Sequence, residues 1–276
     1  MNQYLCFIGR LELLPQRKLL KQFTEIRWWN SMSVRRCDPT SLGADPAYLG
    51  SRYGPLRISR VCFPFIDFIP VLNVDNYGKS RYNSNAVNLN RNYSVNWGKS
   101  RERFGSEPFS EPETKANSVY MNTVVQDADL YVTMHTGVWI MLYPWGKWPE
   151  QPSDWELFHY IRDEINGNIS DIPIRNANQG LYPNCGTSRD YGYGVMGYPT
   201  FTFETDDEQF LLGTVESLSD RLSEELDVMR YLIQNVWYWR ARLVFEKLEI
   251  TNNQISIEVS NLGHSSTANA TINYYN

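Results

Sequence analysis

The chain has 276 residues, enough for one large domain or a domain with an appendage. Its 42% hydrophobic content indicates a globular protein with a substantial core. It carries 26 Lys and Arg against 31 Asp and Glu, a net charge of −5, so no general affinity for nucleic acid is expected. The most apolar segment, residues 61–72, is interrupted by Pro64, Asp67 and Pro70 and is shorter than the roughly 20 residues of a membrane helix.

The start of the chain and its cysteines leave localisation open. Residues 1–10 lack the basic start and the long apolar run of a signal peptide. The spacing of the cysteines gives no Cys-x-x-Cys pair, so a thiolate metal site is not expected; they are Cys6, Cys37, Cys62 and Cys185.

The first ordered pattern begins near residue 61. Residues 1–60 show no steady helical or strand period, and we interpret them as a divergent or misread N-terminal segment. The apolar run 63–71 predicts a buried strand. Ser110 and Glu113 match a capping box, which predicts that a helix begins there.

Two strands and two helices follow. Apolar and polar residues alternate over 130–135 and again over 200–204, which predicts strands. A helix is predicted over 154–164, and a long amphipathic helix over 215–233. Strands that alternate with helices predict an α/β fold, a mixed and mostly parallel sheet with helices on both faces.

The last part of the chain changes character after Leu243. Ile255, Ile257 and Val259 alternate with polar residues, as in a strand. We therefore divide the chain into residues 1–60, a main domain over 61–242, and the start of a β-rich extension over 243–276.

Three polar residues suit the binding of a carboxylate. Arg81 and Arg91 offer planar forks of donors that match a carboxylate, and Asn90 adds a neutral donor. The alternative is that both arginines are solvated loop cations, since arginine is usually exposed.

Two further residues stand where ligand groups gather in α/β sheets, at the carboxyl ends of strands. His135 ends one predicted strand, and neutral imidazole is a good zinc ligand. Glu204 ends another, and a carboxylate there can act as a general base. A buried structural histidine and a surface acid are the alternatives.

The segments that contain these residues resemble one family over roughly residues 61–240. Asn83 to Tyr93, Met134-His135-Thr136-Gly137, the turn Tyr143-Pro144-Trp145-Gly146 and the strand that ends at Glu204 are similar to the zinc metallocarboxypeptidases of the carboxypeptidase A type. The resemblance implies a metalloprotease that uses zinc to hydrolyse the last peptide bond of a peptide or protein. Many members are secreted or extracellular.

The resemblance also implies roles for individual residues. Asn90, Arg91 and Tyr182 would hold the terminal carboxylate of the substrate, and Arg81 would stabilise the oxyanion. His135 would be the third zinc ligand, and Glu204 would carry protons. Arg189 would line the base of the side-chain pocket and favour an acidic C-terminal residue. The alternatives are that it pairs with a neighbouring acid such as Asp190 or turns to solvent, and neither would give a preference.

The metal site departs from the family pattern. The family takes two of its three zinc ligands from a His-x-x-Glu motif, and no such motif occurs in this sequence. Asn88 stands where the family usually has Asp. The sequence therefore leaves three alternatives: a carboxypeptidase with impaired activity, a domain that binds peptide C-termini without cutting them, or an incomplete gene product.

Overall fold

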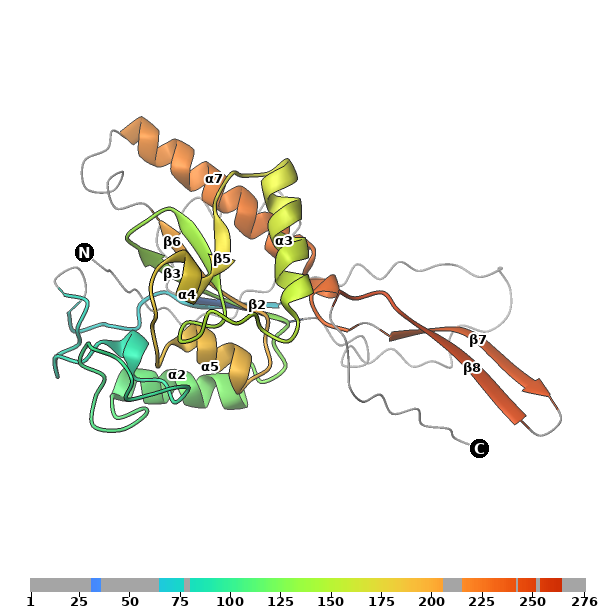
Figure 1. The fold of residues 1–276 in the computed structure, drawn as a ribbon, viewed down its shortest axis with the longest axis horizontal. Coiled ribbons are helices and arrows are strands. Elements are labelled where there is room, and N and C mark those ends of the chain that lie inside the picture. The colour runs from blue at the N-terminus through green and yellow to red at the C-terminus, as the bar shows by residue number, and fades with distance from the viewer. Residues whose placement is uncertain are drawn as a thin grey trace.

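The computed structural model describes residues 31–35, 65–76, 80–205, 215–241, 243–251 and 254–264. These residues form a six-stranded sheet covered by helices, from which a hairpin projects (Figure 1). The strand order across the sheet is β2 (Phe65–Ile69), β1 (Ser31–Arg35), β3 (Leu130–Thr136), β6 (Thr200–Thr205), β4 (Ile140–Tyr143) and β5 (Ile174–Asn176).

The predicted mixed α/β sheet is confirmed, and its pairings show where crossovers occur. β3 pairs with β6 and β4 with β5 in parallel, and the other three described pairings are antiparallel. Parallel neighbours need a long connection, and the one between β4 and β5 contains the helix α3 (Trp155–Asn168). β1 comes from the N-terminal segment, and it pairs with both β2 and β3.

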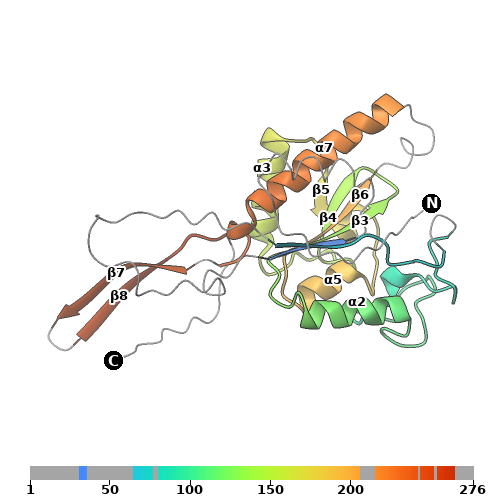
Figure 2. The same cartoon turned by 180° about the vertical axis from the view of Figure 1, so that it is seen from behind.

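Helices cover both faces of the sheet, as predicted. α3 and α7 (Val215–Gln234) lie on one side, and α2 (Pro112–Thr123) and α5 (Ser188–Gly194) lie on the other (Figures 1 and 2). Successive side chains of β3 point to opposite faces of the sheet, so this strand contacts both layers of helices. Leu130 and Val132 are buried in a cluster with residues of α3 and α7, whereas Tyr131 is buried with residues of α2 and α5.

The predicted capping box at the start of α2 is wrong. The helix begins at Pro112, so Glu111 occupies the N-cap position, and its side chain makes no capping hydrogen bond. Ser110 Oγ donates to Glu111 instead, at 2.8 Å. Asn83 and Asn85 also donate to the Glu111 carboxylate, at 2.7 and 2.8 Å. Asn83 and Asn85 lie far from Glu111 in sequence, so these long-range contacts, and not the local motif, determine the start of the helix.

The C-terminal strands form a separate two-stranded sheet. β7 (Leu243–Thr251) and β8 (Gln254–Asn261) pair antiparallel, and the hairpin points away from the main sheet (Figures 1 and 2). It is joined to the main domain through η4 (Val236–Tyr238), and the ring of His264 stacks on Tyr160 of α3 at 3.9 Å. None of the described helices has the length and apolar character needed to cross a membrane.

A buried carboxyl group on α7 predicts a pH-dependent stability. Thr205 Oγ1, at the end of β6, donates to Glu225 at 2.8 Å. Burial raises the pKa of Glu225 to about 7, although the Thr205 hydrogen bond and the positive charge of Arg221 act in the opposite direction. The folded protein therefore holds this proton more tightly than the unfolded chain does, and stability is lost as pH rises from the ordinary pKa of 4.5 to about 7.

We expect Glu225→Gln to abolish this pH dependence. The wild-type free energy of unfolding should fall by on the order of 3 kcal/mol across that range, because the buried carboxyl must ionise. Urea denaturation at a series of pH values measures it. Asp220→Asn, an exposed acid on the same helix, is the control and should leave the slope unchanged. A Glu225→Gln protein with the full wild-type slope would contradict the expectation.

Candidate active site

The structure places His135 and Glu204 side by side. β3 and β6 run parallel, and their register puts His135 directly opposite Glu204. Both side chains are half-buried. A Cβ added to Gly137, just after β3, would lie 3.6 Å from Glu204 Oε2, so the carboxylate lies over the backbone beyond the strand end. The histidine and the glutamate predicted from separate segments therefore share one edge of the sheet.

The positive charges of three arginines act on the imidazole of His135. The pKa of His135 is lowered to about 3, chiefly by desolvation and then by the positive charges of Arg91, Arg189 and Arg81. Thr133 Oγ1 lies 3.0 Å from His135 Nε2. The ring is therefore neutral at physiological pH, and the charges of the three predicted arginines help to keep it so.

Arg91 is held in a short 3-10 helix, η3 (Leu89–Arg91), with its guanidinium buried. Arg91 Nη2 donates to the hydroxyl of Tyr182 at 3.3 Å. Asn90 Oδ1 accepts a hydrogen bond from the backbone N–H of Ser188 at 3.0 Å. The segments around residues 90 and 185 are thus joined, although they are far apart in sequence. Arg81, Asn90, Arg91 and Tyr182, which the sequence predicts to bind a carboxylate, are called the clamp below.

A glutamate that no sequence motif marks, Glu102, lies within the clamp. Glu102 Oε1 accepts from Arg91 Nη2 at 2.9 Å, and Glu102 Oε2 lies 3.7 Å from Arg81 Nε. Asn88 Nδ2 also donates to Glu102 Oε2. Glu102 belongs to the charged run Lys99-Ser100-Arg101-Glu102-Arg103, a pattern that usually indicates a solvated loop. No local signal distinguishes it from the charges beside it.

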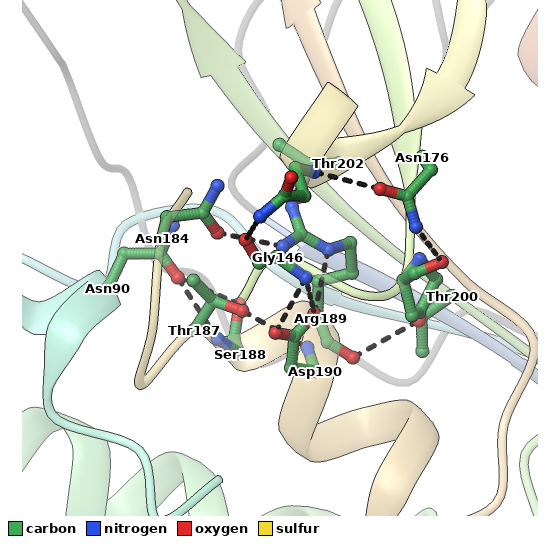
Figure 3. Close-up of polar contacts among 12 residues, drawn as sticks. Asn90, Gly146, Asn176, Asn184, Thr187, Ser188, Arg189, Asp190, Thr200 and Thr202 are labelled. Atoms are coloured by element: carbon green, nitrogen blue, oxygen red, sulfur yellow. Dashed lines mark hydrogen bonds and ion pairs between the residues drawn. The ribbon is translucent and has the colours of Figure 1, made fainter. Parts of the chain in front are cut away.

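Arg189 is buried, and each nitrogen of its guanidinium donates to a protein oxygen (Figure 3). Nε pairs with Asp190 Oδ1 at 3.0 Å, Nη2 donates to Asn184 at 2.9 Å, and Nη1 donates to Thr202 at 3.4 Å. Asp190 also accepts from the backbone N–H of Gly146. The arginine is thus paired with its neighbouring acid, one of the alternatives that the sequence left open.

The described residues do not fit a zinc ion with three protein ligands. Among them, no group of three or more His, Cys, Asp or Glu side chains is placed to hold a metal. The two other histidines of the sequence lie elsewhere, since His159 contacts the Tyr143 hydroxyl at 3.1 Å and His264 stacks on Tyr160. Of the three histidines, His135 is the one that lies opposite Glu204 at this edge of the sheet.

Comparison with known proteins identifies relatives of this site and fold. Residues 66–224, more than half of the chain, match the family model described as zinc carboxypeptidase. Carboxypeptidase O of Bos taurus is 26% identical over 210 residues, 63% of this chain and 56% of that protein. Human mast cell carboxypeptidase A is 28% identical over 189 residues, 56% of this chain and 45% of that protein. The chain thus spans about half the length of these relatives.

Solved structures agree with the sequence match. Bovine thrombin-activatable fibrinolysis inhibitor, in complex with tick carboxypeptidase inhibitor, aligns with a TM-score of 0.50 and 26% identity over 61% of this chain and 68% of that chain. Carboxypeptidase A from Helicoverpa armigera aligns with a TM-score of 0.51 and 23% identity over 60% of this chain and 50% of that chain, which shows the shared fold. The chain therefore belongs to the zinc carboxypeptidase family.

Proposed function

We propose that this chain binds the free C-terminal carboxylate of a peptide or protein through the clamp of Arg81, Asn90, Arg91 and Tyr182. The observation that carries the proposal is the position of Glu102, whose carboxylate lies between Arg91 and Arg81. A carboxylate of the chain itself thus occupies the space between the two guanidinium groups. Buried arginine is well suited to this role because its donors match both oxygens of a carboxylate.

We further propose that hydrolysis is impaired in this chain. The chain belongs to a family of hydrolases, the zinc carboxypeptidases. We propose Glu204 as the proton carrier and Arg81 as the oxyanion donor, the roles that the resemblance implies. When bound, zinc would polarise the scissile carbonyl and lower the pKa of a water molecule. A hydrolytic zinc site needs three protein ligands and an open position, and no group of three His, Cys, Asp or Glu side chains that could hold a metal is found among the described residues.

A preference for acidic peptide ends remains part of the proposal, in a weaker form. Arg189 is proposed to line the side-chain pocket, but Asp190 balances its charge. A ligand carboxylate would therefore gain less binding free energy from Arg189 than from a buried guanidinium without a partner. We expect peptides that end in Glu to bind only slightly more tightly than those that end in Leu, and those that end in Lys to bind least.

The clamp is tested by calorimetric titration with one peptide as its free acid and as its amide. We expect the wild-type protein to prefer the free acid, and Arg91→Ala to remove that preference, because the ligand's carboxylate then has no buried guanidinium with which to pair. Arg101→Ala, an exposed arginine outside the clamp, is the matched control and should bind as wild type does. Equal binding of acid and amide by a folded sample would rule the clamp out.

The same samples test the catalytic half of the proposal. Metal analysis after dialysis, together with mass spectrometry of the peptide after incubation, should show neither a tightly held zinc ion nor a shortened product. One zinc per chain and chelator-sensitive cleavage would show instead an active carboxypeptidase. A sharp cooperative unfolding transition would exclude the alternative of an incomplete gene product that does not fold.

A further inference from the structure

Glu102 lies where the proposed ligand is expected to place its own carboxylate. Its Oε1 accepts from Arg91 Nη2 at 2.9 Å, and its Oε2 lies 3.7 Å from Arg81 Nε. The side chain of Arg91 is 5% exposed, so few other directions are open to a partner, whereas that of Glu102 is 24% exposed. The internal pair therefore uses the donors that a peptide's carboxylate would need.

The backbone beside Glu102 is fixed against the clamp. The N–H of Asn88, immediately before η3, donates to the carbonyl of Arg103 at 2.9 Å. The carbonyl of Phe104 accepts from Asn92 Nδ2 at 2.8 Å and from Trp97 Nε1 at 2.9 Å. The residues that follow Glu102 are thus tied to the segment that contains Arg91. The backbone around Glu102 is therefore anchored, whereas the Glu102 side chain is partly exposed to solvent.

The side chain of Asn88 stabilises the position of Glu102 in the clamp. Its Nδ2 donates to Glu102 Oε2, and its Oδ1 accepts from the N–H of Asn90 at 3.1 Å. An aspartate at position 88 would have no donor for Glu102 and would place a second negative charge against it. The amide found where the family usually has an acid is therefore complementary to a glutamate turned into the clamp.

We propose that Glu102 competes with the ligand's carboxylate for Arg91 and thereby determines which ligands the clamp accepts. This inference rests on the proposed function. Two carboxylates on one buried guanidinium repel each other, so a peptide must displace Glu102 before its own carboxylate can bind. The replacement of the Glu102 carboxylate by the ligand's carboxylate on Arg91 therefore changes the free energy little. Affinity therefore depends on the contacts made by the rest of the peptide.

The test compares wild type with Glu102→Gln, which keeps the shape of the side chain and removes its charge. We expect the variant to bind the free-acid peptide about tenfold more tightly, since a clamp that is free about one-tenth of the time has its apparent affinity reduced by that factor. Binding of the amidated peptide should not change. Glu107→Gln, an exposed glutamate of the same loop, should bind as wild type does.

A second variant separates charge from loss of fold. Glu102→Asp keeps the charge but withdraws it by one methylene, so it should also tighten free-acid binding, and thermal unfolding shows whether each variant is folded. If the variants prefer the free acid but bind it with wild-type affinity, the Glu102 inference is wrong and the clamp stands. If the wild-type protein and the variants all bind the free-acid and the amidated peptide equally, the clamp proposal and the Glu102 inference are both wrong.

Discussion

Replacement of Asp190 by alanine should lower the free energy of unfolding by about 3–5 kcal/mol, because it leaves a buried charge without its partner. The Asp190 side chain has no exposed surface and that of Arg189 is 3% exposed, with Nε and Oδ1 3.0 Å apart. Alanine also removes the acceptor of the Gly146 N–H. The guanidinium would keep only the neutral acceptors on Asn184 and Thr202.

A second Arg–Asp pair in the same chain supplies the control. Arg162 Nε lies 2.8 Å from Asp163 Oδ1, so the residue types, the spacing in sequence and the atoms that pair are the same. The Asp163 side chain is 67% exposed, however, and solvent screens an exposed pair. Asp163→Ala should therefore change stability by no more than about 0.5 kcal/mol. Urea denaturation measures both variants, and similar losses would show that burial does not set the strength of the Arg189–Asp190 pair.

The elements that could be predicted from the sequence are those with a clear hydrophobic period. β3, β6, α3 and α7 all lie where alternation or a helical face predicts them. β1, β4 and β5 have three to five residues each, which is too short for a period to be recognised. β1 also gains its partners from segments about 30 and 100 residues away, and contacts of this kind leave no trace in a local pattern.

The residues of the site also divide into those that the sequence marks and those that it does not. Residues within recognisable segments, such as Arg91, His135 and Glu204, could be selected in advance, and the structure brings His135 opposite Glu204. Glu102 could not be selected, because its role depends on two arginines and an amide that reach it through folding. The pairing of Arg189 with Asp190 was one of the open alternatives, and burial of both side chains favours this internal pair.

Replacement of Gly186 by alanine should both destabilise the fold and weaken the clamp. The glycine has a φ of +65°, and its N–H donates to the Val95 carbonyl at 2.9 Å while its own carbonyl accepts from the Tyr93 N–H at 3.0 Å. An added Cβ would overlap the Arg91 carbonyl oxygen and lie 2.8 Å from its carbonyl carbon. Because these are backbone atoms within a hydrogen-bonded pair of segments, they cannot move aside cheaply.

We expect Gly186→Ala to lose about 1–2 kcal/mol from the left-handed backbone and about 1–3 kcal/mol from overpacking. Gly197→Ala is the matched control, since Gly197 has a φ of +73° but nothing within 4 Å of an added Cβ, so it should show the backbone loss alone. Chemical denaturation gives both losses. The Gly186 variant should also bind free-acid peptides more weakly, because the segment that carries Tyr182 must shift away from Arg91. Equal losses in the two variants, with unchanged peptide binding, would mean that close approach at Gly186 does not hold the clamp together.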